Sequence, residues 1–226
     1  MKIFIDPGHG GVDAGAAGPS GVLEKNINLE FARVLAETLT AGGHSVKLAR
    51  TDDYFLDLAP RAELANEWGA DLFVSIHCNT STPAARGTET FSYPGSSAGA
   101  QVAARIQESL TKAWNTVNRG VKTANFAVLR RTTMPSVLIE LAFLSNPAEE
   151  KLLLHPGMRQ KGARAVFEGI TGEKPAPTPK MNVEQAKAVI RRHVDSPNLT
   201  QWFDYLLARD GGGKLLIRWA KSYSNV

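Results

Sequence analysis

The chain has 226 residues, 43% of them hydrophobic and 21% charged, which is typical of a globular protein with one full domain and room for a small second one. No stretch approaches the roughly 20 apolar residues of a membrane-spanning helix, and the opening MKIFIDPGHGG is interrupted too early to be a secretory signal peptide. We therefore expect synthesis in a cytoplasm, without a leader. A single cysteine, Cys78, excludes an internal disulfide.

Strand-like and helix-like segments alternate along the first 170 residues. Continuous apolar or alternating runs predict strands at residues 2–6, 45–50, 71–77, 87–93 and 135–141. Helical periodicity predicts helices over about 27–41, 60–68, 98–114 and 156–170, and Asn146 is predicted to cap a further helix that has Pro147 in its first turn. This alternation is typical of an α/β fold in which helices flank a mostly parallel central sheet.

A proline-rich segment, TGEKPAPTPK at residues 171–180, indicates a semi-rigid linker between two domains, residues 1–170 and 181–226. After it, three helical patterns run from Asn182 to about Val194, from about Leu199 to Arg209 and from Lys214 to Tyr223, which predicts a small all-α C-terminal module. Residues 1–170 carry 17 basic and 17 acidic side chains, whereas residues 171–226 carry nine and five. The excess positive charge of the second part indicates an anionic partner there.

Four polar residues lie at or near predicted strand ends. His9 follows the first strand, His77 closes the strand from residue 71, Glu140 ends the strand from residue 135, and Glu24 lies across a glycine-rich loop from His9. In open parallel sheets, such side chains converge beyond the carboxyl ends of the strands. Two imidazoles and a carboxylate suit a catalytic zinc ion, and glycines let the chain turn sharply around His9. Zinc would lower the pKa of its water to roughly 7 and Glu140 would transfer the proton, so the pattern favours metal-assisted amide hydrolysis.

Each residue also has a simpler interpretation. His9 could cap a helix, His77 could be a hydrogen-bonded core histidine, and Glu24 could be a first-turn carboxylate that faces the helix dipole. Glu140 is the hardest to explain in this way, because a charge within VLIELAF is costly without a partner. Cys78 neighbours His77 on the strand and so faces the other side, which predicts a core position.

Several longer motifs resemble the zinc-dependent N-acetylmuramoyl-L-alanine amidases of type 3, found in bacterial autolysins and phage endolysins. The resemblance covers roughly residues 2–170, in the expected order: FIDPGHGGVDAGAAG, EKNINLEFARVLAETL, LARTDDYFLDLAPRAELAN, ADLFVSIHCN and NRGVKTANFAVLRRTTMPSVLIELAFLSNPAEEKLL. It implies that His9, Glu24 and His77 bind zinc and that Glu140 is the catalytic carboxylate. The implied substrate is peptidoglycan, cut between N-acetylmuramic acid and L-alanine. Ala142 departs from a more usual glycine and Ala49 from a more usual threonine, and neither is a ligand position.

The C-terminal module resembles no family that we can name. Its basic and aromatic character favours binding to anionic cell-wall polymers, as appendages of endolysins commonly do. Two other interpretations stay open. The module could serve dimerisation, and most of its large apolar side chains are expected to form the core of a helical bundle: Trp202, Phe203, Leu206 and Trp219.

Rival functions differ in how well the sequence supports them. A catalytically inactive wall-binding protein conflicts with the intact set of four site residues. A phosphate-handling or nucleic-acid-binding protein is not expected, because the chain has neither a P-loop lysine spacing nor a nucleic-acid motif. A zinc peptidase that cuts within the stem peptide stays open. The expected setting is a phage endolysin, held in the host cytoplasm until the membrane is permeabilised, although a host autolysin released on lysis would have the same sequence features.

Overall fold

The structure is a computed structural model that describes residues 1–175, 183–193, 199–207, 214–218 and 220. The chain divides into two compact units, Met1–Ala176 and Pro177–Val226. The first unit contains the predicted α/β fold, and the described residues of the second are helical.

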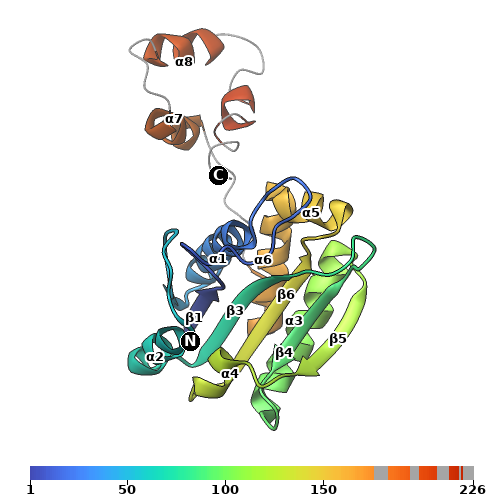
Figure 1. The fold of residues 1–226 in the computed structure, drawn as a ribbon. Coiled ribbons are helices and arrows are strands. Elements are labelled where there is room, and N and C mark those ends of the chain that lie inside the picture. Colours follow the sequence, from blue (N-terminus) through green and yellow to red (C-terminus); the bar gives the residue numbers. More distant parts are fainter. Residues whose placement is uncertain (176–182, 194–198, 208–213, 219, 221–226) are drawn as a thin grey trace. The chain divides into compact units, whose positions relative to one another are not determined.

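A six-stranded sheet forms the centre of the first unit (Figure 1). Its strands are β1 (Lys2–Pro7), β2 (Ser45–Leu48), β3 (Leu72–Asn79), β4 (Thr88–Ser92), β5 (Asn118–Thr123) and β6 (Ser136–Phe143). The order across the sheet is β2-β1-β3-β6-β4-β5. Neighbours pair in parallel except β4 and β6, which are antiparallel. The prediction of a mostly parallel sheet is confirmed.

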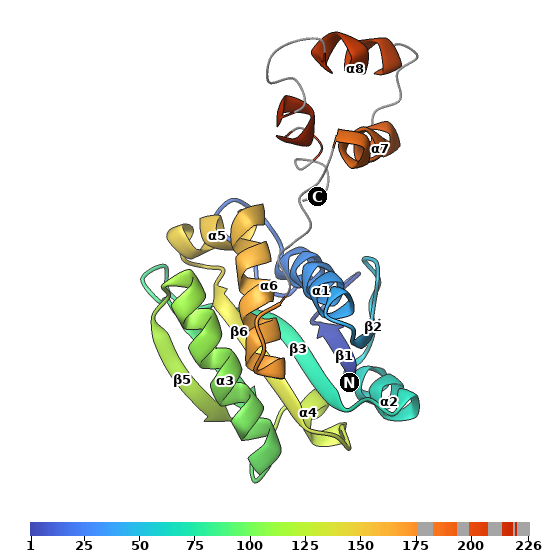
Figure 2. The same ribbon diagram turned by 180° about the vertical axis from the view of Figure 1, so that it is seen from behind.

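Helices cover both faces of this sheet. They are α1 (Glu24–Ala41), α2 (Leu58–Trp68), α3 (Ser97–Trp114), α4 (Ala127–Arg131), α5 (Pro147–Leu154) and α6 (Pro156–Thr171). Figure 2 shows α1, α3 and α6 in front of one face, where they enclose the larger hydrophobic core. Helices α2 and α4 contact each other on the opposite face, over a smaller core.

The twofold alternation of strand side chains decides which residues reach which face. On β1, Ile3 and Ile5 lie in the larger core and Phe4 lies in the smaller one. On β3, Ile76 and Cys78 likewise lie in the larger core. His77, between them, therefore points to the α2 and α4 side. The prediction that Cys78 is a core residue is confirmed, since it is 3% exposed.

Two elements were not predicted, β5 and α4. The β5 sequence NRGVKT is almost wholly exposed and has no apolar run, and α4 has only five residues. Three boundaries beside the predicted site residues also differ from the prediction. Strand β3 continues past His77 to Asn79, β6 continues past Glu140 to Phe143, and Glu24 is the first residue of α1 rather than a residue before it.

The described residues of the second unit are helical. They comprise α7 (Val183–His193), α8 (Leu199–Leu207) and a helical segment at 214–218. Phe203 and Leu206 are buried with Ile190 and Leu216, which confirms the core prediction for those two residues. The side chains of Trp202 and Trp219 lie outside the described residues, as do 176–180 of the predicted linker and the predicted helix ends at 182, 194, 208–209 and 221–223.

None of the helices among the described residues combines the length and apolarity needed to cross a bilayer.

Candidate metal centre and active site

His9 lies on a tight turn that leaves the end of β1. Its φ is +62°, and Gly10 and Gly11 follow with φ of +136° and +56°. A left-handed conformation at a residue other than glycine costs about 1–3 kcal/mol, so its surroundings must hold it. Asp13 does so in two ways. Its backbone exchanges two hydrogen bonds with Gly10, and its Oδ2 lies 2.9 Å from His9 Nδ1. The turn thus orients the imidazole with Nε2 directed away from Asp13.

Glu24 presents its carboxylate from the first turn of α1. The amides of Cys78 and Ala16 donate to Oε1 and Oε2 at 3.0 and 2.9 Å. Asn28, one turn further along α1, adds a side-chain donor to Oε1 at 3.3 Å. The side chain is only 5% exposed. These donors fix a buried carboxylate between the helix and the end of β3.

Two glycines make room for the ligand candidates to approach one another. A Cβ at Gly8 would lie 2.2 Å from Cε1 of His77. A Cβ at Gly15, whose φ is +65°, would lie 2.6 Å from Glu24 Oε2 and 2.8 Å from His9 Cδ2. The glycine-rich loop therefore serves close packing of the site as well as the turn at His9.

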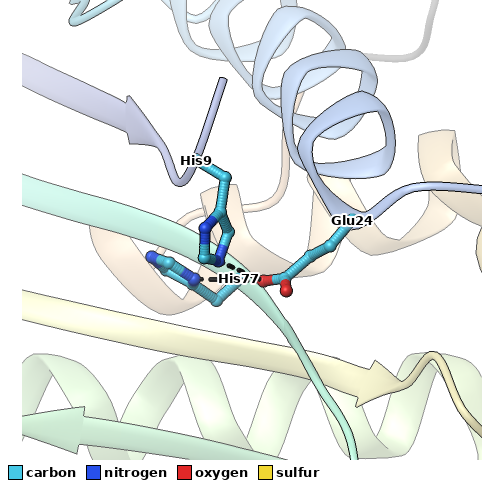
Figure 3. Close-up of side chains that lie close together, drawn as sticks. All are labelled: His9, Glu24 and His77. Carbon is cyan, nitrogen blue, oxygen red and sulfur yellow. Dashed lines mark hydrogen bonds and ion pairs between the residues drawn. The ribbon is translucent and has the colours of Figure 1, made fainter. Parts of the chain in front are cut away.

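Figure 3 shows His9, Glu24 and His77 converging from three different elements. Glu24 Oε1 is 3.2 Å from Nε2 of His9 and 3.1 Å from Nδ1 of His77. One ligand atom from each residue lies within 4.8 Å of the other two. Two imidazole nitrogens and one carboxylate oxygen at this spacing match the kind of three-ligand donor set that catalytic zinc sites use. The donor set therefore fits the metal that the sequence predicts.

The electrostatics of the cluster favour a cation among these groups. Burial lowers the pKa of His9, but hydrogen bonds and charge from Glu24 and Asp13 outweigh it and raise that pKa to about 9. Burial alone would raise the pKa of Glu24, but its hydrogen bonds to His77 and His9 hold that pKa far below the ordinary range. In the metal-free protein, the carboxylate of Glu24 therefore stabilises the protonated form of the His9 imidazole.

Glu140 lies beside this cluster, on the next strand. It is paired with His77 in the β3–β6 register, and a pocket of about 530 Å³ is lined by His9, His77 and Glu140. Oε2 of Glu140 is buried and has no hydrogen-bond partner among the described residues. Burial raises the pKa of Glu140 to about 7, with repulsion from Glu24 and Glu89 adding to it. A carboxyl with this pKa can accept and return a proton near neutral pH.

Further pocket walls come from the loop before α2, from α2 and from α4. The remaining lining residues include Asp6, Asp13, Phe55, Leu56, Arg61, Phe126, Val128 and Leu138. The structure thus brings all four predicted site residues to one place. Their roles as metal ligands and catalytic carboxylate stay predictions.

Comparison with known proteins gives the family. The sequence model of the N-acetylmuramoyl-L-alanine amidases matches residues 3–172. The chain belongs to this amidase family. The resemblance inferred from its motifs is confirmed, and so is the prediction of an enzyme of this class.

Relatives of the amidase domain include both bacterial and phage proteins. The catalytic domain of CwlV, an amidase from Bacillus (Paenibacillus) polymyxa var. colistinus, is 38% identical with a TM-score of 0.73, over 76% of this chain and 97% of that one. The sporulation-specific amidase of Bacillus subtilis is 39% identical, over 75% of this chain and 67% of its own length. The endolysin of Bacillus phage SPP1 is 35% identical in a 217-residue alignment that covers 88% of this chain and 79% of that protein.

One charged cluster beside the amidase site was missed by sequence reasoning. Glu89 on β4 pairs with Glu140 in register and is 6% exposed. It accepts hydrogen bonds from Asn79, Arg119 and Lys122 at 2.7, 2.7 and 2.6 Å. Burial raises its pKa, but these donors outweigh burial and lower it. The sequence contains a signal for this cluster, because Glu89 places a charge within the predicted strand 87–93, as Glu140 does within the predicted strand 135–141.

Proposed function

We propose that the chain is a zinc-dependent peptidoglycan amidase that hydrolyses the amide between N-acetylmuramic acid and L-alanine. His9, Glu24 and His77 would hold the metal, and Glu140 would act as general base and then general acid. The observation that carries this proposal is the convergence of the three ligand atoms within 4.8 Å, next to a buried carboxyl whose oxygen lacks a hydrogen-bond partner among the described residues.

A bound zinc ion supplies Lewis acidity, which acidifies a water molecule and polarises a carbonyl group. The protein contributes ligand orientation. Asp13 holds His9 through Nδ1, and the amide of Cys78 and the side chain of Asn28 hold Glu24. Such hydrogen-bond partners fix the tautomer of a histidine ligand and the direction in which each ligand points.

Glu140 supplies the proton transfers. Its carboxylate takes a proton from the attacking water, and the resulting carboxyl gives that proton to the leaving amine of the alanine. Because burial raises its pKa to about 7, neither protonation state is strongly disfavoured at neutral pH. The orphaned Oε2 is free to bind the water or the amine during these transfers.

Two substitutions test the assigned roles separately. Glu140→Gln should keep zinc affinity and lose about 10²–10⁴-fold in turnover, because only the proton transfer is removed. His77→Ala should lose both zinc and turnover. Glu108→Gln, on the exposed side of α3, and His155→Ala, on the surface, are matched controls that should change neither. Normal wall solubilisation by Glu140→Gln would show that its assigned role is wrong.

We also propose that the chain acts as a phage endolysin and that residues 181–226 bind the cell wall. The similarity to the SPP1 endolysin covers 88% of the chain, more than the amidase domain alone, which supports this setting. The net positive charge of residues 171–226 suits anionic wall polymers. In this setting the protein is made in the host cytoplasm and reaches the wall after the membrane is permeabilised.

A further inference from the structure

Arg50 is an unusual arginine, because it is fully buried just after β2. Its relative exposure is 0%, and it heads the largest fully buried side chains among the described residues. Arginines are almost never fully buried unless they are paired, so such a residue is expected to have a specific bonding role.

The guanidinium of Arg50 donates to four backbone carbonyls. Nε donates to Pro7 at 3.0 Å, Nη2 donates to Gly8 and Lys25 at 3.0 and 2.7 Å, and Nη1 donates to Asp52 at 3.2 Å. Each of these hydrogen bonds goes to the main chain rather than to a carboxylate. The planar, rigid fork of arginine suits several carbonyls at once, whereas the single nitrogen of lysine does not.

The carbonyls that Arg50 binds come from two separate segments of the proposed metal site. Pro7 and Gly8 lie directly before His9, and Lys25 directly follows Glu24. Gly10 lies against the same side chain, since a Cβ there would be 3.0 Å from Cδ and Nε of Arg50. Arg50 thus packs beneath the turn that presents His9 and reaches the first turn of α1 that presents Glu24.

Arg61 offers a comparison within the same site. It donates to the carbonyls of Pro7 and His9 at 2.8 and 2.9 Å and forms an ion pair with Asp6 at 2.8 Å. Arg61 also donates to the carbonyl of Leu56 at 2.9 Å, so its contacts join the His9 segment to α2 and the loop before it. Arg50 differs because its hydrogen bonds join that segment to α1.

We propose that Arg50 is a positioning residue for the metal centre, which fixes the distance between the His9 and Glu24 ligands by bonding the carbonyls beside both. The inference rests on the proposed zinc function. Ligand affinity for a metal depends on such outer partners, whose loss typically weakens binding 10–100-fold.

The test compares Arg50→Met and Arg50→Lys with Arg159→Met in the full-length protein. Arg159, on α6, is a matched control because it is also buried, at 5% exposure, and donates to the carbonyls of Leu153 and Leu154 on α5. It also forms an ion pair with Glu30 on α1 at 2.9 Å, and none of these three partners is a ligand candidate or its sequence neighbour. Zinc affinity is measured by competition with a fluorescent chelator. The absorption spectrum of the Co²⁺-loaded protein reports ligand geometry, and thermal unfolding of the metal-free proteins reports stability.

We expect Arg50→Met to bind zinc 10–100-fold more weakly and to alter the Co²⁺ spectrum, with Arg50→Lys intermediate. Arg159→Met should lose thermal stability and keep both zinc affinity and spectrum. If Arg50→Met does not fold, the affinity and spectrum of Arg50→Lys decide. Folded Arg50 variants with parental zinc affinity and spectrum would overturn the inference, as would an equal loss in Arg159→Met. Failure of the parent itself to bind zinc would instead refute the proposed function.

Discussion

His9 shows how one residue can depend on the conformation of its own backbone and on two carboxylates. Its left-handed φ of +62° directs the ring between Asp13 and Glu24, which lie 2.9 and 3.2 Å from its two nitrogens. These contacts make the imidazole a proton-binding site when no metal is present. The same contacts orient it for a metal, so proton and metal compete for this residue.

This competition predicts a pH dependence in the metal-free protein. Because the folded-state pKa of His9 is raised from 6.5 to about 9, its stabilising protonation is fully present below pH 6.5 and is lost as the pH rises towards 9. We expect the free energy of unfolding to fall by on the order of 3 kcal/mol across that window. Urea unfolding at pH 6 and pH 9, in the presence of a chelator, measures it. His9→Gln should remove this fall, and a fall that persists in that variant would contradict the assignment.

The close packing of Gly15 against Glu24 and His9 leads to a second prediction, about zinc affinity. Gly15→Ala introduces a Cβ within 2.6 Å of Glu24 Oε2 and 2.8 Å of His9 Cδ2, so it should displace both ligands and weaken zinc binding at least tenfold. Gly21→Ala is the matched control. Its φ of +85° carries a similar backbone cost, but a Cβ there contacts nothing within 4 Å. Competition with a chelator measures the zinc affinity of both variants, and we expect a loss only in Gly15→Ala. Equal zinc affinities would refute the packing role of Gly15.

Packing between elements holds the sheet that carries the site. Helices α3 and α6 approach closely because two α6 positions that face α3 are glycines. A Cβ at Gly162 would lie 2.3 Å from the ring of Trp114, and a Cβ at Gly169 would lie 2.5 Å from the backbone of Ile106. The Trp114 indole donates to the carbonyl of Met158 at 2.7 Å, which fixes the ring between the helices.

Gly169→Ala should therefore destabilise the first unit by about 1–3 kcal/mol, because the backbone of α3 must move to admit the methyl group. Gly157→Ala, in the exposed first turn of the same helix, meets only the movable ring of His155 at 3.1 Å and should stay within about 0.5 kcal/mol of the parent. Denaturant unfolding of the metal-free proteins compares them. Zinc affinity should be unchanged in both, so a weaker Gly169→Ala site would contradict the separation of packing from the metal centre.

The sequence predicts an element well when the pattern of its own residues determines it, and poorly when contacts with distant residues determine it. Strands β1, β3 and β6 are apolar runs, and the expectation that His9, His77 and Glu140 converge near one edge of the sheet agrees with the structure, although β3 and β6 continue past His77 and Glu140. Strand β5 has no such run, and its described contacts include ion pairs from Arg119 and Lys122 to Glu89 on β4. Arg50 was also beyond local reasoning, because its partners are carbonyls of distant segments that only the folded chain brings together.

At the scale of the whole chain, charge separates the two units. The first 170 residues are neutral, and the net charge of +4 belongs to the rest. In the described part of the second unit, apolar side chains such as Phe203 and Leu206 are buried, so the proposed wall contact would be made by charged side chains. This division predicts that catalysis and attachment to the wall can be separated.

A chain ending at Ala176 should keep the zinc affinity and turnover of the full chain on a small soluble muramoyl-peptide. It should also sediment less with purified walls, and the difference should shrink at high salt because the proposed attachment is electrostatic. Sedimentation and soluble-substrate assays measure the two properties. Equal sedimentation of the short and full chains would contradict wall binding by residues 181–226, and a dimer found only in the full chain would support a role in association instead.

End-group analysis of digested peptidoglycan, with and without a zinc chelator, tests the central claim most directly. The account predicts new N-terminal alanine amines without new reducing sugars, lost on chelation and restored by zinc. New amines on other residues would identify a stem-peptide peptidase. No new ends, with the protein bound to sedimented walls, would mean that His9, Glu24, His77 and Glu140 form a site without hydrolytic activity.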